Sequence, residues 1–167
     1  MPGSAFLSLG SGTQKVRIFV SYDREHDADL LDRLDEQASR SMSGFEISGR
    51  SATRCPTDHW DEALRCKIRE ADQVIVICGQ HTDRSSRVGA ELRITQEEER
   101  PYTLLWGRRE PMCTKPTTAR PADSMYSWTP EILQAQISNR RRLAEPDPRV
   151  AKAGHATISA CFMRHCV

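Results

Sequence analysis

The chain has 167 residues, a length that suits one compact domain with extensions at its ends. Its 24 Lys and Arg residues nearly balance its 23 Asp and Glu residues, and a net charge of +1 gives no overall attraction to nucleic acid or anionic lipid. No apolar run approaches the roughly 18 residues that cross a bilayer, and the segment AFLSL near the start is too short for a signal-peptide core. We therefore expect a cytoplasmic protein that neither crosses a membrane nor binds nucleic acid.

The first half of the chain alternates between strand and helix patterns. Residues 1–14 are rich in Gly and Ser and predict a flexible leader. Residues 16–20, VRIFV, form a short β-branched run that predicts a buried strand. From residue 24 to about residue 39, apolar residues recur four apart opposite charged ones, which predicts an amphipathic helix. Residues 45–48, FEIS, alternate between apolar and polar and predict a short second strand.

The middle of the chain continues the alternation. Asp58 is predicted to cap a helix that ends near Ala71, because apolar residues recur there every four positions. Residues 73–78, QVIVIC, are almost continuously apolar and β-branched. That pattern is typical of a parallel strand covered on both faces, so this segment is the best candidate for the central strand.

Four further segments complete the predicted order. A helix is expected over residues 85–99, capped by one of its first two serines and ended by the proline that follows. TLLWG, residues 103–107, predicts a strand, and the Pro- and Thr-rich residues 111–121 predict a long exposed loop. A Thr-Pro pair then opens a helix over residues 129–140. The alternation predicts an α/β fold, in which helices flank both faces of a parallel sheet.

The six cysteines form no recognisable metal or redox motif. None belongs to a CxxC pair, and the His and Cys residues near the C-terminus match no metal-ligand spacing. We therefore expect reduced thiols and no metal site. The cysteines are Cys55, Cys66, Cys78, Cys113, Cys161 and Cys166.

Polar side chains follow two of the predicted strands. Ser21, Tyr22 and Asp23 come after the first strand. His81 and Thr82 come after the third. In open α/β sheets, ligands bind outside the carboxyl ends of the strands, where the strand order reverses. If the order is flavodoxin-like, these two strand ends are neighbours and their side chains share one crevice.

Glu91 is the candidate catalytic carboxylate. It lies about one and a half turns inside the helix that follows the third strand, near the same edge of the sheet. Arg87 precedes it by one turn, and Gly89 removes bulk so that a ligand can come close. A carboxylate there can stabilise the positive charge that develops on a sugar carbon when a glycosidic bond breaks. The alternative is that Glu91 is a solvated surface residue and that His81 and Asp23 are local caps.

Two stretches carry a family resemblance. VRIFVSYD, followed by an amphipathic helix, resembles the opening box of TIR domains. QVIVICGQHTDRSSRVGAEL resembles the TIR-like group that includes the synthase subunit of Thoeris antiphage systems. The similarity spans about residues 16–137. The residues that match the second motif are Gly79, His81, Thr82, Ser85, Ser86, Val88 and Glu91.

The resemblance implies a flavodoxin-like sheet in a TIR-like domain over residues 15–140, with residues 141–167 as an extension of unknown role. It implies an NAD glycohydrolase or ADP-ribosyl cyclase that cleaves the nicotinamide–ribose bond of NAD with Glu91 as the catalytic residue. NAD is then the substrate, and no further cofactor is expected. The substrate-binding candidates, chosen for their predicted nearness, are Ser21, Tyr22, Asp23, His81, Thr82 and Arg87.

The resemblance also implies partners. The product would be a cyclic ADP-ribose-type signal that activates an effector protein, and the chain would associate with itself. The chain departs from its relatives at Arg87, where they carry an aromatic residue. Two other functions remain open: a non-catalytic signalling or scaffold module that binds a TIR partner or a nucleotide, and an enzyme like the nucleoside deoxyribosyltransferases.

Overall fold

The computed structural model describes residues 14–51, 60–110 and 112–144. Nearly all of the predicted leader, the predicted cap at Asp58 and most of the C-terminal extension lie outside these ranges. The elements are β1 (Val16–Ser21), α1 (Ala28–Ser39), β2 (Phe45–Arg50), α2 (Trp60–Glu70), β3 (Gln73–Cys78), the short 3-10 helix η1 (Thr82–Arg84), α3 (Ser86–Glu97), β4 (Tyr102–Trp106), β5 (Met125–Ser127) and α4 (Pro130–Ala144).

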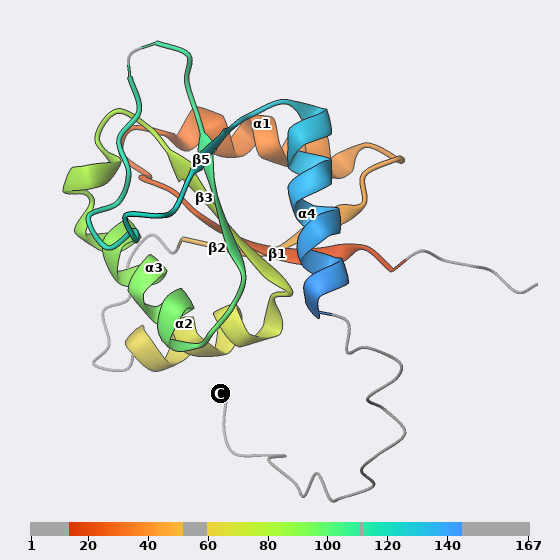
Figure 1. The fold of residues 1–167 in the computed structure, drawn as a ribbon, viewed down its shortest axis with the longest axis horizontal. Coiled ribbons are helices and arrows are strands. Elements are labelled where there is room, and N and C mark those ends of the chain that lie inside the picture. The colour runs from red at the N-terminus through yellow and green to blue at the C-terminus, as the bar shows by residue number, and fades with distance from the viewer. Residues whose placement is uncertain (1–13, 52–59, 111, 145–167) are drawn as a thin grey trace, which may run out of the picture.

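The strands of the described residues form one parallel sheet in the order β2-β1-β3-β4-β5 (Figure 1). This is the flavodoxin-like order, and it makes β1 and β3 neighbours at the point where the order reverses. The predicted α/β class and parallel sheet are confirmed. The carboxyl ends of β1 and β3 therefore share one edge, as the sequence suggested.

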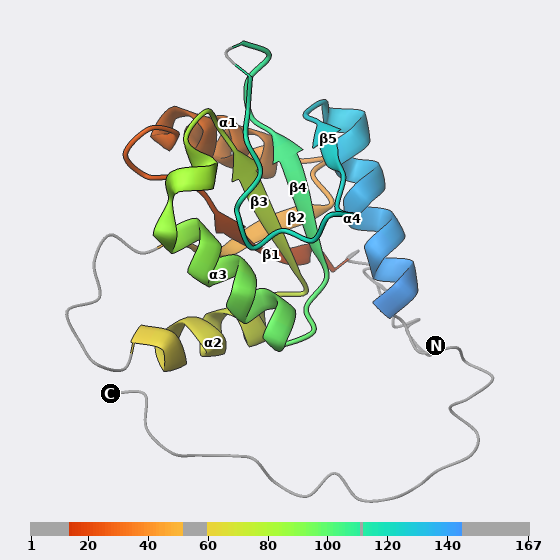
Figure 2. The ribbon, with the colours of Figure 1, turned by 60° about the vertical axis from the view of Figure 1, so that its left-hand side comes forward.

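Helices cover both faces of the sheet (Figure 2). Leucines of α1 and apolar residues of α4 pack on one face, against alternate side chains of β1 and β3. Apolar residues of α2 and α3 pack on the other face. Every residue of β3 is buried, which confirms it as the central strand covered on both sides. The sheet thus sits between two helical layers.

Helix α1 begins at Ala28 and not at the predicted Arg24. A turn comes first, because the carbonyl of Asp23 accepts a hydrogen bond from the backbone N–H of Asp27 and the Asp23 carboxylate accepts one from Glu25. Such local hydrogen bonds compete with helix formation. The consequence is a loop over residues 24–26 at the sheet edge where a ligand would bind.

Three further segments differ from prediction. β2 continues to Arg50, two residues beyond the predicted end, and this brings Ser51 to the carboxyl edge of the sheet. β5 was missed because it has only three residues and is partly buried. The predicted exposed loop over residues 111–121 is partly packed: Cys113 is buried, and Thr114 donates its backbone N–H to the carbonyl of Gly79.

The remaining element limits lie close to the predicted ones. α2 and α3 end one and two residues early, at Glu70 and Glu97, and α4 continues to Ala144. In the parts of the chain that the structure describes, no helix is both long and apolar enough to cross a membrane.

Candidate active site

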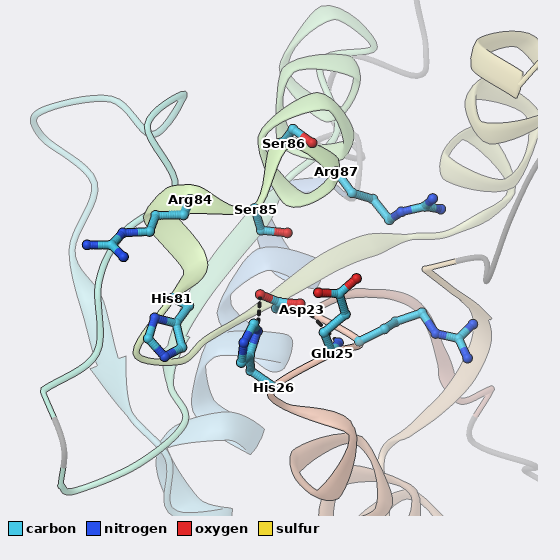
Figure 3. A pocket seen from close by; sticks show the side chains of 9 residues that line it. Asp23, Glu25, His26, His81, Arg84, Ser85, Ser86 and Arg87 are labelled. Atoms are coloured by element: carbon cyan, nitrogen blue, oxygen red, sulfur yellow. Dashed lines mark hydrogen bonds and ion pairs between the residues drawn. The ribbon is translucent and has the colours of Figure 1, made fainter.

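A polar pocket of about 730 Å³ lies at the carboxyl edge of the sheet. One wall is the loop between β1 and α1, and the other is the segment that joins β3 to α3 (Figure 3). This is the crevice position that the strand order predicts. The lining residues are Asp23, Arg24, Glu25, His26, His81, Arg84, Ser85, Ser86 and Arg87.

Contacts across the pocket join its two walls. The Nδ1 atom of His26 lies 3.0 Å from Oδ2 of Asp23, within the first wall. The rings of His26 and His81 are tilted against each other with centroids 4.5 Å apart, and they face each other in Figure 3. The predicted neighbours Asp23 and His81 therefore do meet at one site, with His26 between them.

Guanidinium groups dominate the charge of this pocket. Arg84 at the end of η1 and Arg87 in the first turn of α3 point in opposite directions (Figure 3). Arg24 adds a third guanidinium from the other wall, and the carboxylates of Asp23 and Glu25 on that wall offset part of the positive charge. Guanidinium groups bind phosphate oxygens in a bidentate manner, so the pocket suits a ligand with phosphate groups.

Glu91 is buried beside this pocket and is not part of its lining. Its side chain is 1% exposed. Its Oε2 atom accepts hydrogen bonds from the hydroxyls of Ser21 at 2.6 Å and Ser51 at 2.5 Å. Among the described residues, Oε1 has no hydrogen-bond partner. The alternative of a solvated surface glutamate is therefore wrong, and a carboxylate with one uncommitted oxygen is held inside the protein.

The surroundings of Glu91 differ from the prediction in two ways. Its hydrogen bonds run to Ser21 at the end of β1 and to Ser51 just after β2, so the carboxylate does not open into the crevice between the ends of β1 and β3 where a ligand was expected to reach it. The space around Gly89 is not open to a ligand, because the side chains of Thr117 and Thr118 lie about 3.7–3.9 Å from the position of a Cβ there. Any approach to the carboxylate must come from the pocket side, where Arg87 stands one helical turn away.

Burial raises the pKa of Glu91, and the hydrogen bonds from Ser21 and Ser51 and the charge of Arg87 oppose this rise. The ionised carboxylate therefore lowers the free energy of unfolding. This destabilisation is fully present above the raised pKa of the folded protein, and it disappears as the pH falls through that value toward the ordinary pKa of 4.5.

We expect this linkage to be measurable in unfolding experiments. The Glu91→Gln protein should gain most over wild type above the folded pKa, and the gain should shrink as the pH falls, since Gln does not titrate. Urea unfolding of both proteins at several pH values gives the difference directly, because the other carboxyls titrate equally in both. A difference that stays constant across the pH range contradicts the assigned direction.

Three of the predicted substrate-binding residues do not line the pocket. Ser21 is fully buried against Glu91. Tyr22 is buried, and its backbone N–H donates to the Ser51 hydroxyl at 3.2 Å. Thr82 is buried, and its hydroxyl accepts a hydrogen bond from the backbone N–H of Gly79 at 2.7 Å. These three residues support the site from buried positions, whereas Asp23, His81 and Arg87 line the pocket.

Two residues that the sequence prediction missed are central to the arrangement. Ser51 carries one of the two hydroxyls on Glu91, and His26 links Asp23 to His81. The available signal was positional, since each is a polar residue close behind a strand at the ligand-binding edge. The local sequence pattern predicts a helix at His26 and a loop at Ser51, so it predicts no role in the site for either residue.

A second buried carboxylate supports the pocket wall. Asp27 is 1% exposed, and its Oδ1 atom accepts a 3.4 Å hydrogen bond from Arg108, which also binds Asp29 and the His26 carbonyl. Burial raises the pKa of Asp27, and Arg108 opposes the rise. A Cβ at Gly79 would overlap both carboxylate oxygens of Asp27. The glycine of the second motif thus makes room for a carboxylate of the neighbouring loop.

The buried thiol at the end of β3 is not suited to nucleophilic chemistry. Burial raises the pKa of the Cys78 thiol to about 12, so it stays protonated at neutral pH. Cys66, Cys78 and Cys113 form no disulfide, whereas Cys55, Cys161 and Cys166 lie outside the described residues. The described residues that line the pocket carry carboxylates, imidazoles, guanidinium groups and hydroxyls.

Comparison with known proteins gives a family and a fold. Residues 19–106 match the family described as the TIR-like domain of the Thoeris protein ThsB. The matched range contains every predicted site residue. No match was found among curated proteins.

Two solved structures are similar to this chain. The TIR domain of the Toll-related receptor TRR-2 from Hydra magnipapillata is 13% identical, with a TM-score of 0.51, over 75% of this chain and 94% of that one. A prokaryotic SEFIR domain is 21% identical, with a TM-score of 0.43, over 81% of this chain and 96% of that one. At this identity the first likeness shows the TIR-type α/β fold alone.

Proposed function

The chain belongs to the family of Thoeris ThsB TIR-like domains, and we propose that it cleaves the nicotinamide–ribose bond of NAD with Glu91 as the catalytic carboxylate. The observation that carries this proposal is the buried carboxylate itself, held by two serine hydroxyls beside a pocket rich in guanidinium groups. Family membership supports a role in antiphage TIR-type signalling. In that role the product is a cyclic ADP-ribose-type signal for an effector protein.

The chemistry suits a single carboxylate. When the bond between ribose and nicotinamide breaks, its electron pair stays on the pyridinium nitrogen, and nicotinamide leaves as a neutral molecule without a general acid. The ribose carbon becomes positively charged, and a nearby carboxylate stabilises that charge. Water or a nucleophile of the same dinucleotide then attacks the carbon. Glu91 must be ionised for this role, and the hydroxyls of Ser21 and Ser51 favour the ionised form.

The pocket supplies groups for the rest of the substrate. Arg87 offers its guanidinium group to the diphosphate, and Asp23 and His81 offer partners for ribose hydroxyls. The uncommitted Oε1 atom of Glu91 is the atom assigned to the ribose carbon. Because the carboxylate is covered in this structure, turnover requires a shift of the side chains between the pocket and Glu91.

The test compares NAD with its reduced form. The purified chain should release nicotinamide from NAD and should leave NADH intact. Chromatography of the reaction products measures both. The dihydronicotinamide of NADH is uncharged before cleavage and is a poor leaving group, so it should bind without being cleaved. Equal cleavage of both would show that a cationic leaving group is not needed and would contradict the mechanism.

A scaffold function is the second candidate, and the burial of Glu91 is the observation that favours it. A carboxylate bonded to Ser21 and Ser51 also ties α3 to the ends of β1 and β2. Calorimetric titration with NAD and ADP-ribose, together with the mass in solution, separates the two. Self-association without nucleotide binding would indicate the scaffold, whereas nucleotide binding with nicotinamide release would indicate the enzyme.

A further inference from the structure

A second, shallower pocket adjoins the first. It has a volume of about 370 Å³ and is lined by Trp60, Ser86, Arg87 and Ala90. Ser86 and Arg87 also line the larger pocket, so the two hollows lie on either side of the first turn of α3. The first residue of α2, Trp60, contributes the one aromatic side chain among the described residues that line the smaller hollow.

Arg87 stands between the two pockets. Its guanidinium carbon lies 5.9 Å from the centroid of the Trp60 ring, in a cation–π contact. In Figure 3 its side chain extends away from His26 and His81. Trp60 is partly buried and packs against the core cluster that contains Leu64. The indole is therefore anchored on one side and meets a flat cation on the other.

We propose that Trp60 is a stacking platform for the purine base of the dinucleotide whose nicotinamide ribose occupies the larger pocket. This inference rests on the proposed function. The groups follow one another in the order of the ligand's own parts: an indole for the base, the Arg87 guanidinium for the diphosphate, and Asp23 and His81 for the ribose.

Displacement of the Arg87 guanidinium from the Trp60 ring by the base is favourable for both side chains. Stacking of a base on an aromatic side chain contributes about 1–3 kcal/mol, whereas a cation–π contact at the protein surface contributes about 0.5–1 kcal/mol. The guanidinium that leaves the indole can then bind phosphate oxygens, which are better partners for it than a ring face. The same residue thus covers the platform in the free protein and contacts the diphosphate in the complex.

The test measures binding without turnover. In the Glu91→Gln background, calorimetry gives the affinity for NAD and for nicotinamide mononucleotide, which lacks the adenylate half. Trp60→Leu should weaken NAD binding about tenfold, because one stacked base is lost, and should leave nicotinamide mononucleotide unaffected. Trp60→Phe, which keeps a ring, should retain most of the NAD affinity. Unchanged mononucleotide binding also shows that the larger pocket is intact in the variant.

Each remaining outcome overturns a specific claim. NAD binding that Trp60→Leu leaves unchanged, or that it weakens no more than mononucleotide binding, overturns the platform. Equal losses in Trp60→Leu and Trp60→Phe also overturn it, since a stacking role requires the phenyl ring to substitute. Cleavage of NAD by the Glu91→Gln protein overturns the catalytic assignment alone. Absence of NAD binding to that protein overturns both.

Discussion

Replacing Glu91 with Gln is expected to lower the rate of nicotinamide release by about 100- to 1000-fold, the usual effect of removing one electrostatic group that acts in the transition state. Gln has the same shape and its amide oxygen can still accept from the hydroxyls of Ser21 and Ser51, which hold Oε2 now. What it lacks is the negative charge on the atom assigned to the ribose carbon. The measurement is the initial rate of nicotinamide release at saturating NAD.

The matched control for this variant is Glu97→Gln on the same helix. Glu97 lies in the last turn of α3, where it is exposed and forms surface ion pairs with Arg65 and Arg93. Its neutralisation should leave the rate within twofold of wild type, because a surface ion pair contributes little. Circular dichroism and thermal unfolding of both variants check the fold. Wild-type rates in the folded Glu91→Gln protein would remove Glu91 from the mechanism.

Replacing Gly79 with Ala is expected to destabilise the protein by about 1–3 kcal/mol, the range for an overpacked interior. The added methyl would overlap the carboxylate of Asp27, which is buried and hydrogen-bonded to Arg108. Because the Asp side chain is short, it cannot turn aside without breaking that bond. Urea unfolding at neutral pH measures the loss, and a lower nicotinamide release should accompany it, since Asp27 directly follows His26 of the pocket wall.

Gly44→Ala is the comparison for this second variant. There a Cβ would come 2.5 Å from Nε2 of Gln134, the far end of an exposed, flexible side chain whose hydrogen bond to the Ser138 hydroxyl is long, at 3.5 Å. The stability change should stay within about 0.5 kcal/mol. Adding Asp27→Ala to Gly79→Ala should cost less than the sum of the two single changes, since the overlap disappears. Additive costs would show that the overlap is not the cause.

The architecture could be predicted because the strongest patterns in the chain are local. The apolar run of residues 74–78 predicted a strand covered on both faces, and β3 is buried throughout. The spacing of Leu30 and Leu34 required a helix with one buried side, and both are in the core. Patterns of this kind depend only on neighbouring residues, so they predict helices and strands even when the order of strands in the sheet is unknown.

The contacts of the site depend on residues far apart in the chain. The bond between Ser51 and Glu91 requires β2 to extend to Arg50 and to lie next to β1, and neither feature has a local pattern. The approach of Asp27 to Gly79 depends on a turn that delays α1. Prediction therefore found Glu91 and the edge of the sheet, but placed the carboxylate in an open hollow.

The buried carboxylate also bears on how such a chain can change during evolution. Since the charge of Glu91 opposes folding while its shape fits the site, a neutral residue of the same shape keeps the architecture and relaxes an unfavourable interaction. Selection for folding alone would therefore favour loss of that charge. Under the proposed function, selection for chemistry is what retains the acid, and a single substitution separates the enzyme from a more stable non-catalytic descendant.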